Sequence, residues 1–260
     1  MIGDIFGPLG VKLLSTYLPT LKKEFKPVFI VANAENAAKN GRGVTNNEVN
    51  AIFNAGVHCI TLGNHTWAKS NIFNIIENER IVRPANFPAS NPGKGVRIIQ
   101  AGTTRLAVIN LLGRCFMNGG AACPFLTADE LINDLPASIP ILVDIHTETT
   151  SEKLALAWYL DGKVSAVVGT HTHVQTADER ILTKGTGYLT DVGMVGPYDG
   201  IIGLERQPII NKYTTGLPSK FTVATGRGQF NGVVLTIDQK TCQTKNIQRI
   251  RIDDDSPFLG

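Results

Sequence analysis

The stretch AVVGTHTH, at residues 166–173, decides how this chain folds. A short apolar run that ends directly in polar residues is typical of a buried strand whose carboxyl end opens at the edge of a sheet. His171 and His173 are separated by one residue, so in an extended chain their imidazoles point to the same side. The stretch therefore predicts a strand that delivers two histidines to one place.

The same arrangement occurs at four further places along the chain. Polar residues able to bind a metal follow apolar runs within residues 2–4, 29–36, 59–65 and 141–146. In open α/β sheets, ligands bind in the crevice beyond the carboxyl ends of the strands, so these ends can meet at one site. Together with residues 166–173, these segments contain four of the five histidines, which favours a common site over unrelated turns.

The rest of the chain predicts a layered α/β fold. Short β-branched runs alternate with helical patterns, and no internal repeat is present. The tail after Gly187 carries at most one helical stretch, near Ile209, and ends in alternating strands. This pattern predicts an antiparallel sheet packed on a mixed sheet, with helices outside. The expected strands lie at residues 27–32, 58–62, 96–100, 106–112, 139–145, 164–168, 187–190, 232–237 and 247–252.

Three helix starts show the capping-box pattern, in which a Thr hydroxyl and a Glu three residues later satisfy orphan backbone donors. The pairs are Thr45 with Glu48, Thr127 with Glu130, and Thr149 with Glu152. We expect the third helix over residues 152–160, where Gly162 supplies a left-handed end. A further helix is expected over residues 11–23.

Length and composition favour a single domain over residues 1–260. With 260 residues and 43% hydrophobic content the chain can bury a large core, and α/β folds of this size are often single domains. No apolar run approaches the roughly 18 residues that a membrane helix needs. Asp4 also interrupts the apolar start that a signal peptide would have. We therefore expect a cytoplasmic protein without a membrane partner.

Charge and cysteine content argue against nucleic-acid-binding proteins and against folds that depend on disulfides or a zinc knuckle. The net charge of +3 is small and dispersed, whereas nucleic-acid grooves show clustered Lys and Arg with interleaved aromatic residues. The four cysteines form no C-x-x-C pair, which favours reduced thiols over a disulfide scaffold or a zinc knuckle. Nucleic acid as a partner thus has no support in the composition.

The strand ends provide a set of candidate metal ligands. They are Asp4, Glu35, Asn36, Asn64, His146, His171 and His173. Taken singly, each has an ordinary alternative as a turn former, a helix cap or a hydrogen-bonded core histidine. The pair His171 and His173 is the hardest to explain in that way. His58 precedes an apolar run rather than ending one, so we assign it no role in the site.

The ligand types indicate a class of metal. Imidazole and carboxylate ligands without thiolate suit iron, manganese, zinc or nickel rather than calcium. Two divalent ions would outweigh the charges of Asp4 and Glu35, so the site would attract and polarise a phosphate. In dinuclear sites of this kind a carboxylate bridges metals about 3.5–4 Å apart, together with a water that ionises near neutral pH. Glu35 is the candidate bridging ligand.

Two sets of motifs carry a family resemblance. The motifs GD at 3–4, AENA at 34–37, GNHTW at 63–67 and GTHTH at 169–173 resemble the calcineurin-like metallophosphoesterases. A narrower likeness lies in RPANFP at 83–88, TSEK at 150–153, HVQTAD at 173–178 and TDVGM at 190–194. These motifs are similar to the YmdB subfamily of bacterial cyclic-nucleotide phosphodiesterases. The likeness runs from Gly3 almost to the C-terminus.

The resemblance implies a four-layer α/β/β/α sandwich with a di-iron or di-manganese centre that hydrolyses 2′,3′-cyclic nucleotides or related small phosphodiesters. By motif, one metal would take Asp4, Glu35, Asn36 and His173, and the other would take Glu35, Asn64, His146 and His171. His65 would donate a proton to the departing ribose oxygen while a metal-bridging hydroxide attacks in line. The product would be a 3′-phosphomonoester.

The chain departs from the family pattern near its start. General members of the superfamily carry a His two residues after the first Asp, whereas Phe6 stands there, an absence that the narrower subfamily shares. Only three residues precede Asp4, where the family has a full apolar strand. We expect upstream codons to encode that strand. If the strand is missing, we expect Asp4 to be mobile and the first metal to be weakly held.

Two other functions stay open on the sequence. An RNA-processing nuclease would use the same metal chemistry, although no basic, aromatic groove supports it. A non-catalytic regulatory protein could use the metal site for ligand sensing, an alternative that the shortened first strand leaves open. The loop at residues 193–203 has turn chemistry and is a candidate rim or homo-oligomer contact, with an ordinary surface loop as the alternative. No substrate-binding residue is assigned.

Overall fold

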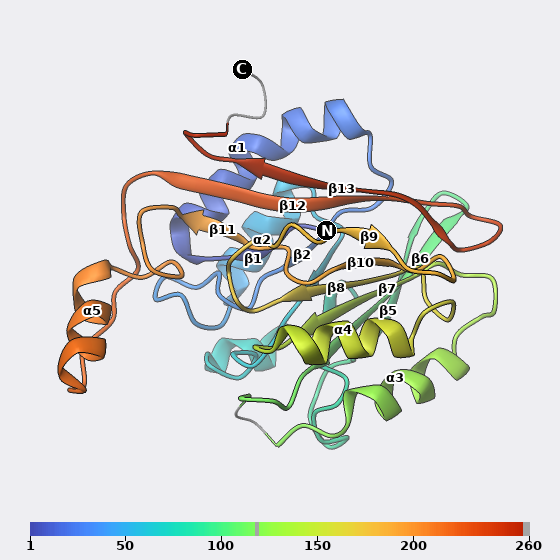
Figure 1. Cartoon of the computed structure of the whole chain (residues 1–260), viewed down its shortest axis with the longest axis horizontal. Helices are drawn as coiled ribbons and strands as arrows, with labels where there is room; N and C mark the ends of the chain where they lie inside the picture. The colour runs from blue at the N-terminus through green and yellow to red at the C-terminus, as the bar shows by residue number, and fades with distance from the viewer. Residues whose placement is uncertain (118–119, 257–260) are drawn as a thin grey trace.

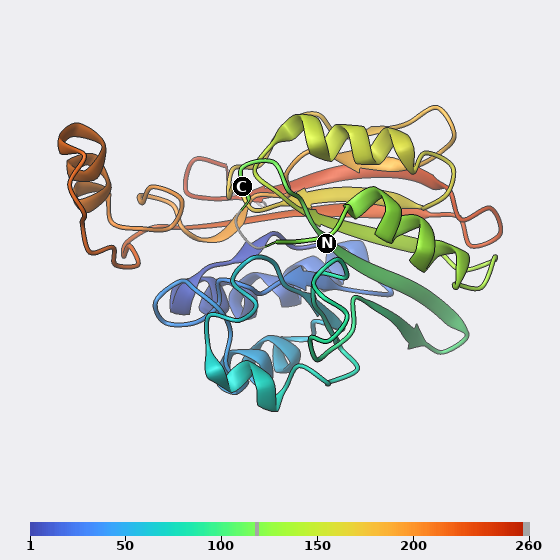
Figure 2. The same ribbon diagram turned by 90° about the horizontal axis from the view of Figure 1, so that it is seen from below.

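The molecule has four layers, with β-sheets stacked at the centre and helices on both outer faces (Figures 1 and 2). The computed structural model describes residues 1–117 and 120–256. Helices α1 (Gly7–Phe25) and α2 (Asn46–Ala55) cover one side, and α3 (Pro124–Asn133) and α4 (Thr150–Tyr159) cover the other. The α/β/β/α sandwich expected from the sequence is confirmed.

The first layer of strands is assembled from two parts that meet at Ile2. One part has the order β1 (Asp4–Ile5), β11 (Met194–Pro197), β12 (Gly228–Ile237) and β13 (Thr244–Ile252). The other has the parallel order β2 (Val31–Asn33), β3 (Cys59–Thr61) and β4 (Ile81–Val82). Ile2 bridges Ala32 on one side and Gly232 on the other, which joins the two parts.

The second layer is a six-stranded sheet. Its order is β5 (Val96–Ala101), β6 (Thr104–Leu112), β7 (Ile141–His146), β8 (Ala166–Thr170), β10 (Gly187–Leu189) and β9 (Arg180–Ile181). The four strands from β6 to β10 run parallel, so their carboxyl ends lie at one edge. This edge carries His146 and the segment that follows Thr170.

Strand periodicity separates the three hydrophobic cores. On β7, Val143 and Ile145 pack toward α3 and α4, whereas Leu142 packs into the core between the sheets. Successive side chains on a strand alternate in direction, so Asp144 and His146 share the inner face with Leu142. The third core lies between α1, α2 and the first layer. The inner face of β7 therefore changes from apolar to polar along the strand.

The short first strand is held firmly, which corrects the expectation of a mobile Asp4. The amide of Gly3 donates to the carbonyl of Asn231, and the amide of Asp4 donates to the carbonyl of Gly193. Asp4 is fully buried and pairs with Met194 in β1 and β11. Backbone hydrogen bonds to segments on both sides therefore hold β1 in place, although it is only two residues long.

Other strands differ from the expected pattern. The strand expected at residues 27–32 is confined to β2, because the amide of Ile30 donates to Nδ1 of His58 at 3.0 Å instead of to a ladder partner. Strands β1, β4, β9 and β11 are only two to four residues long. Such short segments leave too little alternation for a period-2 pattern to indicate them.

Of the three predicted capping boxes, one is confirmed. Thr45 and Glu48 form the box at the start of α2. The prediction of a capping box at Thr127 is wrong, because α3 begins at Pro124 and Thr127 lies within the helix. Thr149 does precede α4, but it makes no capping bond. Glu152 instead accepts hydrogen bonds from the backbone amides of Arg114 and Cys115.

The remaining helices agree with the sequence pattern. Helix α1 covers the stretch expected at 11–23, and α5 (Arg206–Thr215) contains Ile209. Helix α5 stands away from the layered body in both views (Figures 1 and 2). Within residues 1–117 and 120–256, no helix has the length and apolar character needed to cross a membrane. That the whole chain is a single domain stays a prediction.

Candidate active site

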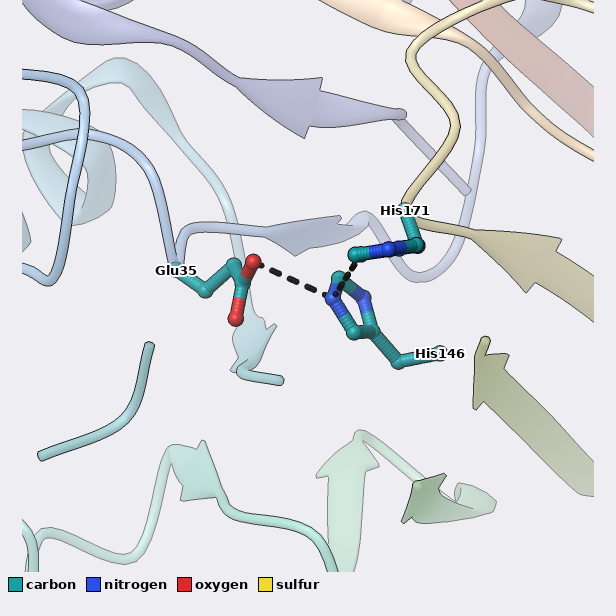
Figure 3. A group of neighbouring side chains, drawn as sticks. All are labelled: Glu35, His146 and His171. Atoms are coloured by element: carbon teal, nitrogen blue, oxygen red, sulfur yellow. Dashed lines mark hydrogen bonds and ion pairs between the residues drawn. The ribbon is translucent and has the colours of Figure 1, made fainter. Parts of the chain in front are cut away.

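The predicted ligands meet at the carboxyl ends of β2, β3, β7 and β8. Figure 3 shows Glu35 and His171 both directed at the same ring nitrogen of His146. The ligand atoms of these three side chains lie within 4.8 Å of one another. Residues separated by more than 100 positions in the sequence thus reach one point because parallel strands end at a common edge.

Nε2 of His146 is the centre of this cluster. It lies 3.1 Å from Oε1 of Glu35, 3.0 Å from Oδ1 of Asn64 and 3.1 Å from Nδ1 of His171. A single ring proton cannot serve three such atoms, whereas one cation can be bound by all four. The donor set of one carboxylate, one amide oxygen and two imidazoles fits a divalent transition metal.

Asp4 faces the same region and has an unsatisfied oxygen. Its Oδ2 accepts the amide of His171 at 3.2 Å, and its Oδ1 lies 3.9 Å from Nδ1 of His146. Oδ1 is buried without a hydrogen-bond partner among the described residues. A buried acceptor without a donor is costly, so a cation at this position would remove the penalty.

Asn36 and His173 form a second pair of ligand atoms. Nδ1 of His173 donates to the carbonyl of Ile202 at 2.9 Å, so the lone pair of Nε2 faces Oδ1 of Asn36 at 3.3 Å. Two acceptors that face each other again fit a cation between them. All seven predicted ligands therefore lie in one connected region, next to His65.

The electrostatics of the cluster are dominated by burial and by the Glu35–His146 pair. Burial alone would lower the pKa of His146, but the carboxylates of Glu35 and Asp4 raise it to about 9. Burial opposes the charge of Glu35, yet His146 and His65 hold its pKa well below the usual range. Burial raises the pKa of Asp4 well above its usual range. A bound cation would replace the proton on His146.

The other two candidate ligand histidines, His171 and His173, are neutral near pH 7. Burial and the neighbouring His146 lower the pKa of His171 to about 3. Burial also lowers the pKa of His173. Neutral imidazoles are the form that binds metals, so both side chains are available as ligands near neutral pH.

His65 lies beside the predicted ligands and remains accessible. Its side chain is 29% exposed, and its amide donates to Oε2 of Glu35 at 2.8 Å. Nδ1 of its ring lies 3.0 Å from Oε1 of Glu35. Among the residues that the structure describes, Nε2 faces only the side-chain amide of Asn64, at 3.5 Å. A histidine that touches a ligand and reaches solvent is suited to proton transfer.

The turn that carries His171 and His173 is strained. Both residues have positive φ angles, 103° and 65°, a region that side chains other than Gly rarely adopt. Asp191 holds the turn, because its Oδ2 accepts the amide of Thr172 at 3.1 Å and its Oδ1 accepts the amide of Gly193 at 2.8 Å. Lys153 donates to the same carboxylate.

Lys153 and Asp191 received no role from the sequence pattern. Both lie in motifs that carry the family resemblance alone, TSEK at 150–153 and TDVGM at 190–194. A Lys in an otherwise apolar helix face is a weak signal for a buried ion pair, because its partner lies 38 residues away. Glu148 is a further contact that no motif indicated, with Oε2 placed 3.2 Å from Nε2 of His171.

Comparisons with known proteins agree with this site. A family described as YmdB-like protein matches residues 1–250. The chain is 52% identical over 260 residues to the 2′,3′-cyclic-nucleotide 2′-phosphodiesterase of Bacillus subtilis (strain 168), in a match that covers 99% of this chain and 98% of that protein.

Two crystal structures share the fold. One, of a hypothetical protein from Thermus thermophilus, has a TM-score of 0.91 and 38% identity over 97% of each chain. The other, of a novel phosphatase from Mycoplasma pneumoniae, has a TM-score of 0.92 and 34% identity over 97% of this chain and 92% of that one. With a sequence match over nearly its whole length and the same fold, this chain belongs to the family of YmdB-like proteins.

Proposed function

We propose that this chain is a phosphodiesterase that hydrolyses 2′,3′-cyclic nucleotides or related small phosphodiesters. The observation that carries the proposal is the crowding of ligand atoms around Nε2 of His146 beside the accessible His65. The name of the Bacillus subtilis relative, which is identical at 52% of positions, supports the substrate class.

Two divalent metal ions fit the candidate residues. One would be held by Asp4, Glu35, Asn36 and His173, and the other by Glu35, Asn64, His146 and His171. Iron or manganese is our first assignment, with zinc or nickel as alternatives, because the ligands are nitrogen and oxygen without thiolate. When bound, the ions would supply Lewis-acid polarisation of the phosphate and would help water to ionise near neutral pH.

The residues of the chain have separate tasks in this proposal. Oε1 of Glu35 accepts from Nδ1 of His65, so Nε2 is the ring atom left to face the substrate. His65, which then carries a proton on Nε2 as well as on Nδ1, donates the Nε2 proton to the 2′ oxygen as the bond between that oxygen and phosphorus breaks, while a hydroxide ion attacks phosphorus from the opposite side. The product is a nucleoside 3′-phosphate. Burial of Glu35 and His146 keeps bulk water from competing for the ligands.

The test is turnover of a cyclic nucleotide by metal-loaded protein. Protein purified without oxygen is analysed for bound metals and then assayed with 2′,3′-cyclic AMP and added Mn²⁺ or Fe²⁺. We expect 3′-AMP, separated from 2′-AMP by chromatography. Product no greater than that of the His65→Ala variant would overturn the proposal.

The same assays distinguish the two other functions. Endonucleolytic cleavage of RNA, with binding that weakens steeply as salt rises, would indicate a nuclease instead. Stoichiometric metal without turnover of any phosphodiester would indicate a ligand sensor. Sedimentation of the purified protein tests for a homo-oligomer. The expectation of a loop over residues 193–203 is wrong at residues 194–197, which form the buried strand β11, so the candidate contact is limited to residues 198–203.

A further inference from the structure

Asp144 lies behind the candidate ligands, between the two layers of strands. It is fully buried on the inner face of β7, two residues before His146. Its carboxylate accepts from three side chains, namely Thr61 at 2.5 Å, Thr170 at 2.7 Å and Asn33 at 3.2 Å. Thr61 and Asn33 come from the first layer, and Thr170 comes from the second.

The hydroxyl of Thr170 links Asp144 to His146. Its oxygen lies 2.7 Å from Oδ1 of Asp144 and 2.9 Å from Nδ1 of His146. The one hydroxyl proton is donated to the carboxylate, so the hydroxyl oxygen must accept from the imidazole. Nδ1 of His146 therefore carries a proton, and Nε2 is the atom directed at Glu35, Asn64 and His171.

Asn33 links the same carboxylate to Glu35. Its Nδ2 donates to Oδ2 of Asp144 at 3.2 Å and to the carbonyl of Leu62 at 3.1 Å. Two acceptors fix the orientation of the amide, so Oδ1 points the other way and accepts the backbone amide of Glu35 at 3.0 Å. The same amide of Asn33 thus also fixes the backbone at Leu62, two residues before the candidate ligand Asn64.

We propose that Asp144 is a positioning residue of the metal centre, acting on His146 through Thr170 and on Glu35 through Asn33. The proposal rests on the metal centre of the proposed function. One carboxylate thus aligns ligands that come from both layers of strands. Partners behind metal ligands fix ring orientation and tautomer, and their loss typically weakens metal binding about 10–100-fold.

The test compares two substitutions at Thr170 in the full chain. Thr170→Val keeps the shape but removes the hydroxyl, whereas Thr170→Ser keeps the hydroxyl. Metal-free proteins are titrated with Mn²⁺, and free Mn²⁺ is followed by electron paramagnetic resonance. We expect Thr170→Val to bind Mn²⁺ about 10–100-fold more weakly and Thr170→Ser to bind close to the unmodified protein.

A spectroscopic readout separates positioning from general stability. In Zn²⁺-loaded protein the Nδ1 proton of His146 is expected to be protected and visible by ¹⁵N-edited NMR. That signal should persist in Thr170→Ser and exchange away in Thr170→Val. Thr186→Val is the matched control, because Thr186 is equally buried but its hydroxyl donates to the carbonyl of Val164, away from the ligands. It should lose stability without losing Mn²⁺ affinity.

Asp144→Asn tests the carboxylate itself. The amide would direct a donor at Thr170 or Asn33, which are donors already, so Mn²⁺ affinity should fall as in Thr170→Val. Unchanged affinity in folded Thr170→Val or Asp144→Asn would overturn the inference, and the Thr170 pair decides if Asp144→Asn does not fold. Failure of the unmodified chain to bind any of the four metals would instead overturn the proposed function.

Discussion

Nζ of Lys153 lies 2.6 Å from Oδ2 of Asp191, and both side chains are completely buried. The pair connects α4 to the segment after β10, across the turn that holds His171 and His173. Burying a charged pair costs desolvation energy. Its presence beside the strained turn indicates that the pair serves to hold that turn. The carboxylate receives two backbone amides in addition to the ammonium, so three donors occupy three of its roughly four lone-pair sites.

Lys153→Met should destabilise the fold by about 3–5 kcal/mol, because it leaves the charge of Asp191 buried without its partner. Urea unfolding followed by circular dichroism measures the change. Lys163→Met is the control, since Lys163 forms a solvent-exposed pair with Asp129 that should be worth only about 0–1 kcal/mol. Equal losses in the two variants would contradict the prediction.

Gly63→Ala should abolish metal binding. A Cβ at this position would lie 2.4 Å from Oε2 of Glu35 and 2.4 Å from Nε2 of His146, so both ligands would have to move. Metal analysis of the purified variant checks the prediction. Gly102→Ala is the comparison: its φ of 60° makes Ala costly for stability, but no atom of the described residues lies within 4 Å of the added carbon, so no ligand has to move. A Gly63→Ala protein with full metal content would show that the ligands can shift freely.

Glu35→Gln should weaken metal binding by at least the roughly 10–100-fold typical of losing a partner behind a ligand. The amide keeps the size of the side chain but removes the charge that raises the pKa of His146. Calorimetric titration with Mn²⁺ provides the dissociation constant. Binding as tight as in the unmodified chain would exclude Glu35 as the bridging ligand.

Metal affinity should rise with pH between 6.5 and about 9, because the proton on His146 must leave before Nε2 can bind. The expected slope is up to about tenfold per pH unit for one displaced proton. His171, with a pKa of about 3, is already neutral throughout this range. Mn²⁺ titrations in a series of buffers check the slope, and an affinity independent of pH would contradict it.

The metal-free protein should show the opposite trend in stability. The pKa of His146 is raised above its unfolded value of 6.5, so its stabilisation is complete below pH 6.5 and is lost as pH rises through about 9. Asp4, whose pKa is also raised, acts in the same direction. Thermal unfolding of metal-free protein across this range is the measurement. A melting temperature that climbs toward pH 9 would be inconsistent with these shifts.

His65→Asn should reduce kcat about 10²–10⁴-fold, the usual contribution of one general acid, and should leave metal content unchanged. The amide preserves a hydrogen bond to Glu35 but cannot transfer a proton. Turnover of 2′,3′-cyclic AMP and metal analysis on the same sample check both parts. Loss of metal together with activity would assign His65 a ligand role instead.

The layers and the cluster of ligands could be predicted because each signal is local. An apolar strand that ends in polar residues is visible within eight positions, as in AVVGTHTH at 166–173. The convergence of several such ends follows from the common edge of parallel strands. The capping box at Thr45 is equally local, since both partners lie within one turn.

The supports of the site could not be predicted, because their partners are distant in sequence. Asp144 meets Thr61 across 83 positions, and nothing in either neighbourhood indicates the other. Glu152 illustrates the opposite error, since its spacing from Thr149 imitates a cap while its carboxylate serves a loop 38 residues earlier. The anchoring of Asp4 depends on carbonyls of Gly193 and Asn231, which local patterns cannot show.

The placement of β1 has a consequence for biosynthesis. Asp4 is synthesised long before its partner strand β11, and Gly3 is synthesised long before Asn231, whose carbonyl accepts its amide. Such long-range pairing is slow, since a large loop must close before it is stabilised. A nascent chain that ends before Asn231 already carries all seven candidate ligands, but it lacks the carbonyl that holds Gly3 beside Asp4. We therefore expect tight cation binding only after Asn231 is synthesised, and metal analysis of ribosome-bound chains that end before and after this residue checks the order.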